Sequence, residues 1–343
     1  MKNTNLFIRA SRKLYQPIDE IYDRFVVGER LSSRLRRYYK TKTQLVQAQT
    51  GNQQIAQLLA GDTPAMVARI GAVELNCLAN YMRIQSAEQT QGIAHFIEMS
   101  RSHETYWMRY VKESMYQYAG FFPPTALMLD RFGADFLKYV SNVDILAIWL
   151  DIYSRETQKK EGLVCQRYCP QAALVPLASL DTYLYPTPWS AALGGKKVLV
   201  VHPFTESIQA QYKKRQLIFK NQQILPDFEL KTIKAVQSIA GNQTQYKNWF
   251  DAYESMCDRI AAEDFDIAII GAGAYGLPLA SFVKTIGKKA VHMGGATQIL
   301  FGIRGKRWDN KPTVSSLYNE HWIKPMISET PDNHKVVEGG CYW

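Results

Sequence analysis

Long apolar runs are absent from the sequence. Its longest clean apolar segments, residues 145–150 and 198–201, fall far short of the roughly 18 residues that a membrane-spanning helix needs. Near the N-terminus, residues 6–8 are too short for the apolar region of a secretory signal, and Arg9 follows them directly. We therefore expect no membrane span and no cleaved leader, and we expect the protein to lie in the cytoplasm.

Cysteine is scarce and scattered. The chain has five cysteines, an odd number without the regular spacing of a disulfide framework, which indicates a reducing compartment. Cys165 and Cys169 are four positions apart, and the nearest histidine downstream is His202. This is not the paired Cys-x-x-Cys spacing typical of structural zinc, so the sequence does not favour a zinc site.

Acidic residues are few at the N-terminal end. Residues 1–45 contain eleven Lys and Arg against four Asp and Glu, a net charge of +7 out of +10 for the whole chain. Apolar residues within 15–25 recur at helical spacing, and a basic cluster follows over residues 34–42. Such an arm could bind an anionic carrier or anionic lipid headgroups at the inner face of the plasma membrane. A solvated basic helix that caps the domain is equally compatible, and no recognised nucleic-acid-binding module accompanies the charge.

Size and composition are those of a globular protein with a substantial core. The chain has 343 residues, of which 46% are hydrophobic and 21% charged, enough for one large or two ordinary domains. We predict a basic helical N-terminal arm over residues 1–60, followed by one catalytic domain over residues 61–343.

Short apolar segments rich in β-branched residues alternate with helical segments over this domain. Such alternation predicts an α/β fold, with a Rossmann-like, mostly parallel sheet covered by helices on both faces. The expected strands are residues 66–70, 143–150, 173–177, 197–201, 228–233, 267–270 and 289–292. Helices are expected at 74–81, through most of 87–140 with a break at Pro123 and Pro124, and at 208–219, 246–262 and 277–286.

The ends of the expected strands collect polar residues and glycines. Ligands of open α/β sheets bind outside the carboxyl ends of the strands. The candidate site there comprises Arg69, Gly71, Glu74, Asp151, His202, Glu206, Gly271, Gly273, Ala274, Tyr275, Gly276, Gly294, Gly295 and Gln298. A single carboxylate in such a place is often a helix cap or an ion-pair partner, and a buried histidine is often satisfied by the backbone, so a structural role remains the alternative for each.

Residues 271–276 form a literal G-x-G-x-x-G between an expected strand and an expected helix. Glycines here allow a tight turn and the close approach of a phosphate to free N–H groups at the helix start. Simple close packing of helix and strand is the alternative. A dinucleotide-binding fold would place an acidic residue about 20 positions further on, where the chain has His292, Met293, Gly294 and Gly295. The sequence therefore disfavours a nicotinamide cofactor.

Residues 67–78, VARIGAVELNCL, resemble the strand-to-helix turn of the GT-D fold glycosyltransferases, a bacterial group built around an R-x-G-D-G-E type sequence. Arg69, Gly71 and Glu74 match this pattern, and Ala72 stands in place of the aspartate. The resemblance implies a Rossmann-like enzyme that transfers sugar from a nucleotide donor. In the family the Asp-x-Glu pair is linked to a divalent metal, so any Mn²⁺ or Mg²⁺ here would depend on Glu74 with one carboxylate fewer.

Residues 266–309 are similar to the C-terminal unit of the same family, and the resemblance extends over roughly residues 62–343. The segments HPF at 202–204 and EGGCYW at 338–343 also resemble proteins of bacterial surface-polysaccharide gene clusters. This implies a glycan or lipid-linked acceptor. The apolar ending is unusual for a frayed terminus, so we expect residues 338–343 to dock on the body near the site.

Glycosyl transfer assigns two tasks to the candidate residues. Negative charge on the leaving diphosphate needs backbone N–H groups at the glycine turn and a cation such as Arg69 or Arg307. The acceptor hydroxyl needs a general base, for which Glu74 is the first choice and Asp151 and Glu206 are alternatives. Two other functions stay open from the sequence: a nucleotide-dependent oxidoreductase of the NAD type, and a non-catalytic glycan-binding protein.

Overall fold

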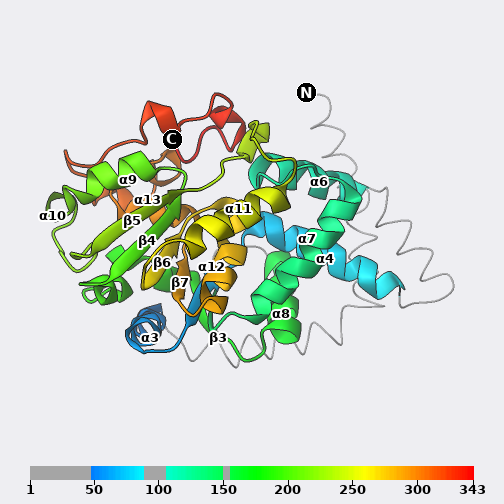
Figure 1. Cartoon of the computed structure of the whole chain (residues 1–343), viewed down its shortest axis with the longest axis horizontal. Helices are drawn as coiled ribbons and strands as arrows, with labels where there is room; N and C mark the ends of the chain where they lie inside the picture. The colour runs from blue at the N-terminus through cyan, green and yellow to red at the C-terminus, as the bar shows by residue number, and fades with distance from the viewer. Residues whose placement is uncertain (1–47, 89–105, 150–154) are drawn as a thin grey trace.

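The computed structural model describes residues 48–88, 106–149 and 155–343 (Figure 1). Nearly all of the predicted basic arm, and the candidate residue Asp151, lie outside the described residues. Among the helices that are described, none combines the length and the apolar character that a bilayer crossing requires.

A single seven-stranded sheet forms the centre of the protein, with the strand order β3-β2-β1-β7-β6-β4-β5. Every pairing is parallel, which confirms the predicted α/β class. The strands are β1 (Ala65–Arg69), β2 (Ile145–Ile148), β3 (Ala173–Pro176), β4 (Lys197–His202), β5 (Glu229–Lys234), β6 (Ile267–Ile270) and β7 (Lys289–His292). All seven expected strands are present, and the continuous apolar runs of β4 and β6 are typical of strands buried on both faces.

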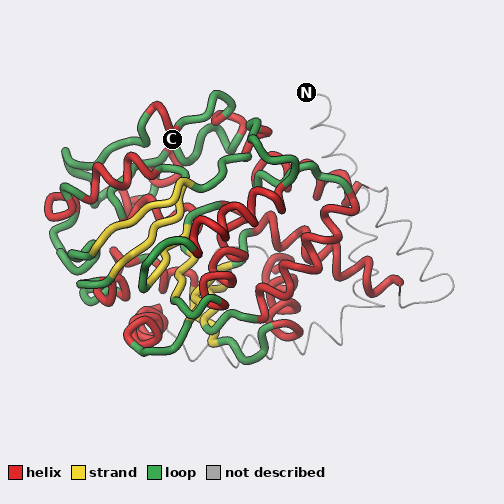
Figure 2. The backbone as a smooth tube through the Cα atoms, in the orientation of Figure 1, coloured by secondary structure: helices red, strands yellow, loops and turns green. Residues whose placement is uncertain are grey.

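Helices cover both faces of the sheet, as Figures 1 and 2 show. One core cluster packs beneath α4 (Ala72–Glu88), α6 (Tyr106–Tyr118), α7 (Ala126–Ser141), α8 (Arg155–Tyr168), α11 (Trp249–Ala261) and α12 (Gly276–Thr285). The second lies beneath α3 (Ala48–Ala60), α9 (Thr205–Tyr212), α10 (Arg215–Ile218), α13 (Thr297–Leu300) and the C-terminal segment with α14 (Lys306–Asp309) and α15 (Pro312–Ser315). Alternate residues of β1 belong to different clusters, Met66 and Ala68 to the first and Val67 to the second, as the pleat of a strand requires.

Helix α3 belongs to the body of the molecule. Ile55 and Leu59 are fully buried in the second core cluster. The Asn52 side chain joins the helix to the segment before β4, donating to the carbonyl of Thr187 (2.9 Å) and accepting from the N–H of Trp189 (2.7 Å). The boundary predicted between arm and domain, at residue 61, therefore falls after α3, although this helix contributes side chains to the core of the domain.

Two predicted helix boundaries differ from the structure for identifiable reasons. Helix α11 begins at Trp249 instead of 246, because the Asn248 side chain accepts hydrogen bonds from the N–H groups of Phe250 and Asp251 and so caps the helix there. The single helix expected at 208–219 is divided into α9 and α10, with Lys214 between them at φ −110° and ψ 15°.

The strand order creates places where ligands of such folds bind, and two of them concern the candidate residues. Helix α9 follows β4 on one face, and α12 follows β6 on the other. The adjacent strands β4 and β6 therefore send their connections to opposite faces, which opens a crevice at their carboxyl ends. The same holds for β1, followed by α4, and β7, followed by α13.

Candidate functional site

Arg69 ends β1 at the crevice between β1 and β7. Its guanidinium lies over the ring of Trp149, which follows β2, at 4.3 Å from the ring centroid. Gly294, after β7, lies beside it: a Cβ built on that glycine would be 3.6 Å from Arg69 Nη1. Within the described part of the chain, the guanidinium has no hydrogen-bond acceptor and no carboxylate within the 4.0 Å of an ion pair. Arg69 is therefore a half-buried cation with no ion-pair partner among the described residues.

Glu74 lies in the first turn of α4, and its side chain folds back over the preceding turn. A Cβ on Gly71 would lie 2.0 Å from Glu74 Oε2, so glycine at position 71 makes room for the carboxylate. Glu74 is 8% exposed. Burial raises the pKa of Glu74, against its own backbone N–H and the charge of Arg69, which both lower it. The carboxyl group can therefore hold or accept a proton nearer to neutral pH than an ordinary glutamate.

Asp181 is a second acidic group near this crevice, and the sequence analysis did not single it out. It follows β3, between two short 3₁₀ turns. Burial raises the pKa of Asp181 to about 6, while Tyr183, Lys311 and Arg69 act in the opposite direction. Arg69 thus lowers the pKa of both Asp181 and Glu74.

Within residues 48–88, 106–149 and 155–343, no cluster of three or more His, Cys, Asp and Glu side chains has the arrangement of a metal site. Glu74 is accompanied by the cation Arg69, where a divalent ion would need further oxygen ligands. The described residues do not fit the divalent metal that the family resemblance implies.

The glycines of the turn after β6 have two different roles: some make room for neighbouring side chains, and one leaves backbone N–H groups without an acceptor. A Cβ on Gly271 would lie 2.6 Å from His202 Cδ2, and one on Gly276 would lie 2.1 Å from His292 Cε1. These two glycines therefore allow side chains to pack closely, which was the alternative to a phosphate cradle. Gly273 differs, because it has φ +54° and only a distant carbonyl oxygen near its Cβ position, at 3.8 Å. The N–H groups of Gly273 and Ala274 have no acceptor within the described residues.

The two candidate donor residues between these glycines, Ala274 and Tyr275, are both 2% exposed. The ring of Tyr275 stacks on Trp249, with centroids 4.7 Å apart and planes at 3°. Their side chains pack in the first core cluster, so a ligand would meet this turn mainly through its backbone.

His202 and His292 lie at the ends of β4 and β7, and both are neutral. Burial lowers the pKa of each to about 3, and Arg69 contributes in the case of His292. His202 Nδ1 accepts from the N–H of Phe204 at 3.0 Å, so the proton of the neutral ring is on Nε2. His292 Nδ1 lies 3.2 Å from the carbonyl oxygen of Ile270, so its proton is on Nδ1.

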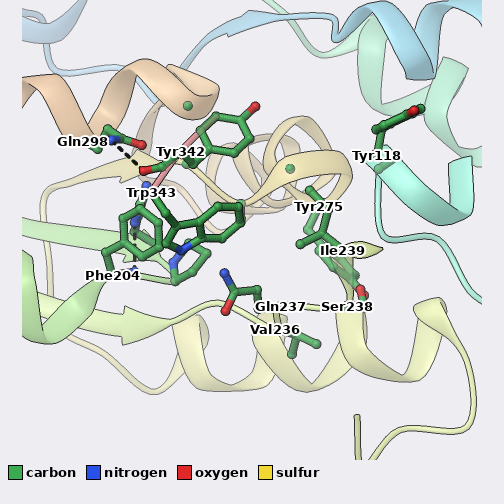
Figure 3. A pocket seen from close by; sticks show the side chains of 17 residues that line it. Tyr118, Phe204, Val236, Gln237, Ser238, Ile239, Tyr275, Gln298, Tyr342 and Trp343 are labelled. Atoms are coloured by element: carbon green, nitrogen blue, oxygen red, sulfur yellow. Dashed lines mark hydrogen bonds between the residues drawn. The ribbon is translucent and has the colours of Figure 1, made fainter. Parts of the chain in front are cut away.

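A cavity of about 650 Å³, including the solvent at its mouth, lies at the crevice between β4 and β6. Figure 3 shows Phe204, Trp343, Tyr342 and Gln298 on one side, and Tyr118, Ile239, Ser238 and Tyr275 on the other. The remaining lining residues are Ala119, His202, Pro203, Val236, Gln237, Gly271, Ala272, Gly273 and Gly295. The sequence analysis found the strand-end residues of this cavity. It missed Tyr118 and Gln237, which follow no expected strand directly.

The C-terminal segment docks on the carboxyl edge of the sheet, as predicted, where Figure 1 shows it in red. Tyr342 packs on Gly295, whose Cβ position lies 2.5 Å from Tyr342 Cε1. Arg307 donates to Tyr342 Oη at 3.1 Å and pairs with Glu338 at 2.6 Å. Gln298 Nε2 donates to the carbonyl of Tyr342 at 3.2 Å. Arg307 and Gln298 were both predicted to bind the sugar donor, but here they bind the C-terminal segment. Gln298 also lines the cavity.

Glu206 lies apart from this group. It is exposed on α9, where its carboxylate accepts from Ser328 Oγ at 2.8 Å and lies 3.9 Å from Lys234 Nζ. The N-terminus of α9 is instead capped by Glu329, which is 2% exposed. Glu329 Oε1 accepts from the N–H of Glu206 at 2.7 Å, and Oε2 accepts from the hydroxyl of Ser207.

The candidates therefore form two neighbouring groups on one edge of the sheet, with β7 between β1 and β6. Arg69, Gly71, Glu74 and Gly294 form the first, and His202, Gly271, Gly273, Gly295 and Gln298 form the second. No family model matches the chain, and searches among curated proteins and among solved structures likewise found no match.

Proposed function

We propose that this protein is a glycosyltransferase that moves a sugar from a nucleotide donor to a glycan or glycolipid acceptor. The observation that carries the proposal is the Arg69 guanidinium, which has no ion-pair partner within the described residues, in the same crevice as the buried Glu74 carboxyl group. A guanidinium removed from bulk water without a directly hydrogen-bonded anion costs free energy. A diphosphate would restore the missing charge and offer oxygens for two parallel hydrogen bonds.

The proposed reaction uses the two groups for different steps. As the bond between the anomeric carbon and the diphosphate breaks, negative charge grows on the leaving oxygen, and Arg69 stabilises it. The N–H groups of Gly273 and Ala274 are further donors on the same edge of the sheet. Glu74 takes the proton of the acceptor hydroxyl, whose oxygen forms the new bond to the anomeric carbon, and a pKa raised by burial is favourable for this role.

Arg69 also accounts for the charge that a divalent ion would otherwise supply. Ala72 occupies the place of the family's aspartate, and the described side chains do not gather into a metal site. The proposal therefore assigns stabilisation of the diphosphate to a guanidinium and to backbone donors. No step depends on a metal ion.

We further propose that the enzyme works at the cytoplasmic face of a membrane. The support is the net charge of +7 in residues 1–45, since basic segments bind anionic headgroups. Vesicle sedimentation with and without anionic lipid tests this directly. Equal binding to neutral vesicles would contradict it.

The experiment for the transferase itself is a thermal-shift screen with nucleotide sugars, followed by mass spectrometry of acceptor products. A bound donor should raise the melting temperature in proportion to its occupancy. Glu74→Gln should still bind donor but transfer at least 100-fold more slowly. Glu320→Gln, at a carboxylate that is 81% exposed, is the matched control and should transfer at the normal rate.

Two other results would replace the proposal. Stabilisation by NAD(H) alone would favour an oxidoreductase. Binding of glycans without consumption of any donor, in the wild type and in Glu74→Gln alike, would favour a glycan-binding protein.

A further inference from the structure

The cavity between β4 and β6 is distinct from the Arg69 crevice. Neither Arg69 nor Glu74 lines it. Strand β7 lies between β1 and β6, so the two places are separated by two strand spacings, about 10 Å. A group bound at the β4 and β6 end of the cavity therefore lies about two strand spacings from the crevice that holds Glu74, further than a reacting hydroxyl can be from its base. It is near enough to belong to the same ligand as a diphosphate at Arg69.

One wall of the cavity is a fixed aromatic ring. Trp343 Nε1 donates to the carbonyl oxygen of Glu329 at 3.2 Å, and the indole packs edge-to-face with Phe204 and His334, at centroid distances of 6.0 and 5.7 Å. Glu329 is itself held at the start of α9. The ring is therefore oriented before any ligand arrives, which reduces the entropy lost on binding.

The opposite wall is also rigid. Tyr275 is clamped between its stacking contact with Trp249 and the hydroxyl of Ser238, 3.3 Å from Tyr275 Oη. Ile239 and Tyr118 continue this wall, and Figure 3 shows them across the cavity from Trp343. The space between the walls thus suits a flat, mostly apolar group.

The polar groups of the cavity are few and neutral. Its lining residues include no Lys, Arg, Asp or Glu, so no side chain of the cavity offers a charge to a phosphate, and only backbone N–H groups such as that of Gly273 could contact one. The amide of Gln237 has no hydrogen-bond partner within the described residues, and His202 has its proton on Nε2 because Nδ1 is an acceptor. Gln237 offers both a donor and an acceptor, and His202 adds a donor. This combination can recognise the edge of a heteroaromatic ring.

We propose that this cavity binds the nucleobase of the sugar donor, stacked against Trp343, with Gln237 as the residue that selects the base. The inference rests on the proposed function, because it assigns one end of the same donor. A sugar also packs on aromatic rings. A sugar that reacts, however, must lie within reach of Glu74, which the position of the cavity does not allow.

The test measures dissociation constants for inorganic pyrophosphate and for UDP, GDP, ADP and CDP by titration calorimetry. Trp343→Ala should weaken binding of the preferred nucleoside diphosphate about tenfold, since base stacking on one aromatic ring contributes that much or more. It should leave pyrophosphate binding unchanged. Trp343→Phe, which keeps an aromatic face, should recover most of the loss.

Gln237→Ala should alter the order of preference among the four bases, whereas Gln216→Ala, at an exposed glutamine of α10, should not. Arg69→Ala should weaken pyrophosphate and nucleotides alike. Equal weakening of pyrophosphate and nucleotide by Trp343→Ala would mean that Trp343 acts only on the structure of the site, and unchanged binding of both would also overturn the inference.

Failure of the transferase proposal has a different signature. Nucleotide binding that depends on Trp343, without sugar transfer to any acceptor, would support the nucleobase site and contradict the transferase proposal. Sugar transfer with Kd values insensitive to Trp343 and Gln237 would do the reverse.

Discussion

Two buried histidines make the folded state sensitive to acid. His202 and His292 are 3% and 5% exposed, and burial lowers the pKa of each to about 3. In the unfolded chain a histidine takes up its proton near pH 6.5. The unfolded state therefore binds more protons than the folded state between pH 6.5 and 3, and the free energy of unfolding falls as the pH is lowered through this window.

The first prediction concerns His202→Asn, whose side-chain oxygen can still accept from the N–H of Phe204. Between pH 7 and 5, the wild type should lose about 2 kcal/mol of stability through His202 alone. The variant should lose less over the same range, whatever its stability at pH 7. Urea unfolding at both pH values measures this, and identical losses in the two proteins would contradict the assignment of His202 as a buried neutral group.

The second prediction concerns Asp181, for which the sign is opposite. Its pKa of about 6 lies above the value of 3.8 for an ordinary aspartate, so the folded state takes up the proton first as the pH falls. The ionised carboxylate therefore destabilises the fold above pH 6, and this cost is lost below pH 4.

Asp181→Asn should accordingly raise the free energy of unfolding at pH 7.5 by about 3 kcal/mol, with a smaller gain at pH 4.5. A gain that is the same at both pH values would show that the change acts through packing and not through charge.

Single residues of the site were predictable where they lie at the end of a clearly apolar strand segment. Arg69 and His202 come directly after apolar β-branched segments, so the strand-end rule placed them correctly at one edge of the sheet. Asp181 follows the short strand β3 in a segment of 3₁₀ turns. Its importance comes from burial, which raises its pKa and leaves no periodic pattern in the sequence.

At the scale of elements, glycine residues allow α12 to begin after β6 and to end before β7. Gly276 starts α12 against the ring of His292, and Gly287 follows the helix at φ +84° with nothing within 4 Å of its Cβ position. The first glycine is needed for space and the second for its backbone conformation.

The third prediction compares alanine at these two positions. Gly276→Ala should destabilise the protein by more than about 2 kcal/mol, because its methyl group meets a buried ring. Gly287→Ala should cost only about 1 kcal/mol, the strain of a left-handed residue. Chemical denaturation of both variants gives the comparison, and a larger cost at Gly287 would count against the packing of His292 on α12.

Strands were easier to predict than helix ends. Most of the strands contain a short apolar run, β5 with its three charged residues being the exception, whereas the start of α11 depends on one side-chain cap at Asn248. The division between α9 and α10 depends on tertiary contacts, since Ile218 and Phe219 turn into the second core cluster while Arg215 pairs with Asp227. Periodicity alone does not contain that information.

At the scale of the whole molecule, the C-terminal segment packs on the carboxyl edge of the sheet and forms part of the candidate site. Cys341 is 4% exposed, and Arg307 binds this segment through the carbonyl of Cys341, the hydroxyl of Tyr342 and the carboxylate of Glu338. Its docking was predictable from an apolar ending, but its partners on α13 and α14 were not.

The fourth prediction is that removal of residues 338–343 lowers the melting temperature by roughly 5 °C or more, because buried contacts are lost and Arg307 loses its partners. The matched control is Glu338→Gln, which removes only one half-exposed ion pair and should shift the melting temperature by less than about 2 °C. Calorimetry of the two proteins decides, and a truncated chain that melts like the wild type would show that the tail contributes no stability.

Glu329 contacts both the start of α9 and the C-terminal indole, which also pack on each other through Phe204. Its carboxylate holds the first N–H groups of α9, and its carbonyl holds the indole of Trp343. Local opening of α9 and displacement of that indole are therefore thermodynamically linked, and linkage is reciprocal. A molecule that binds against the indole must slow amide hydrogen exchange at Glu206 and Ser207, although it touches neither residue.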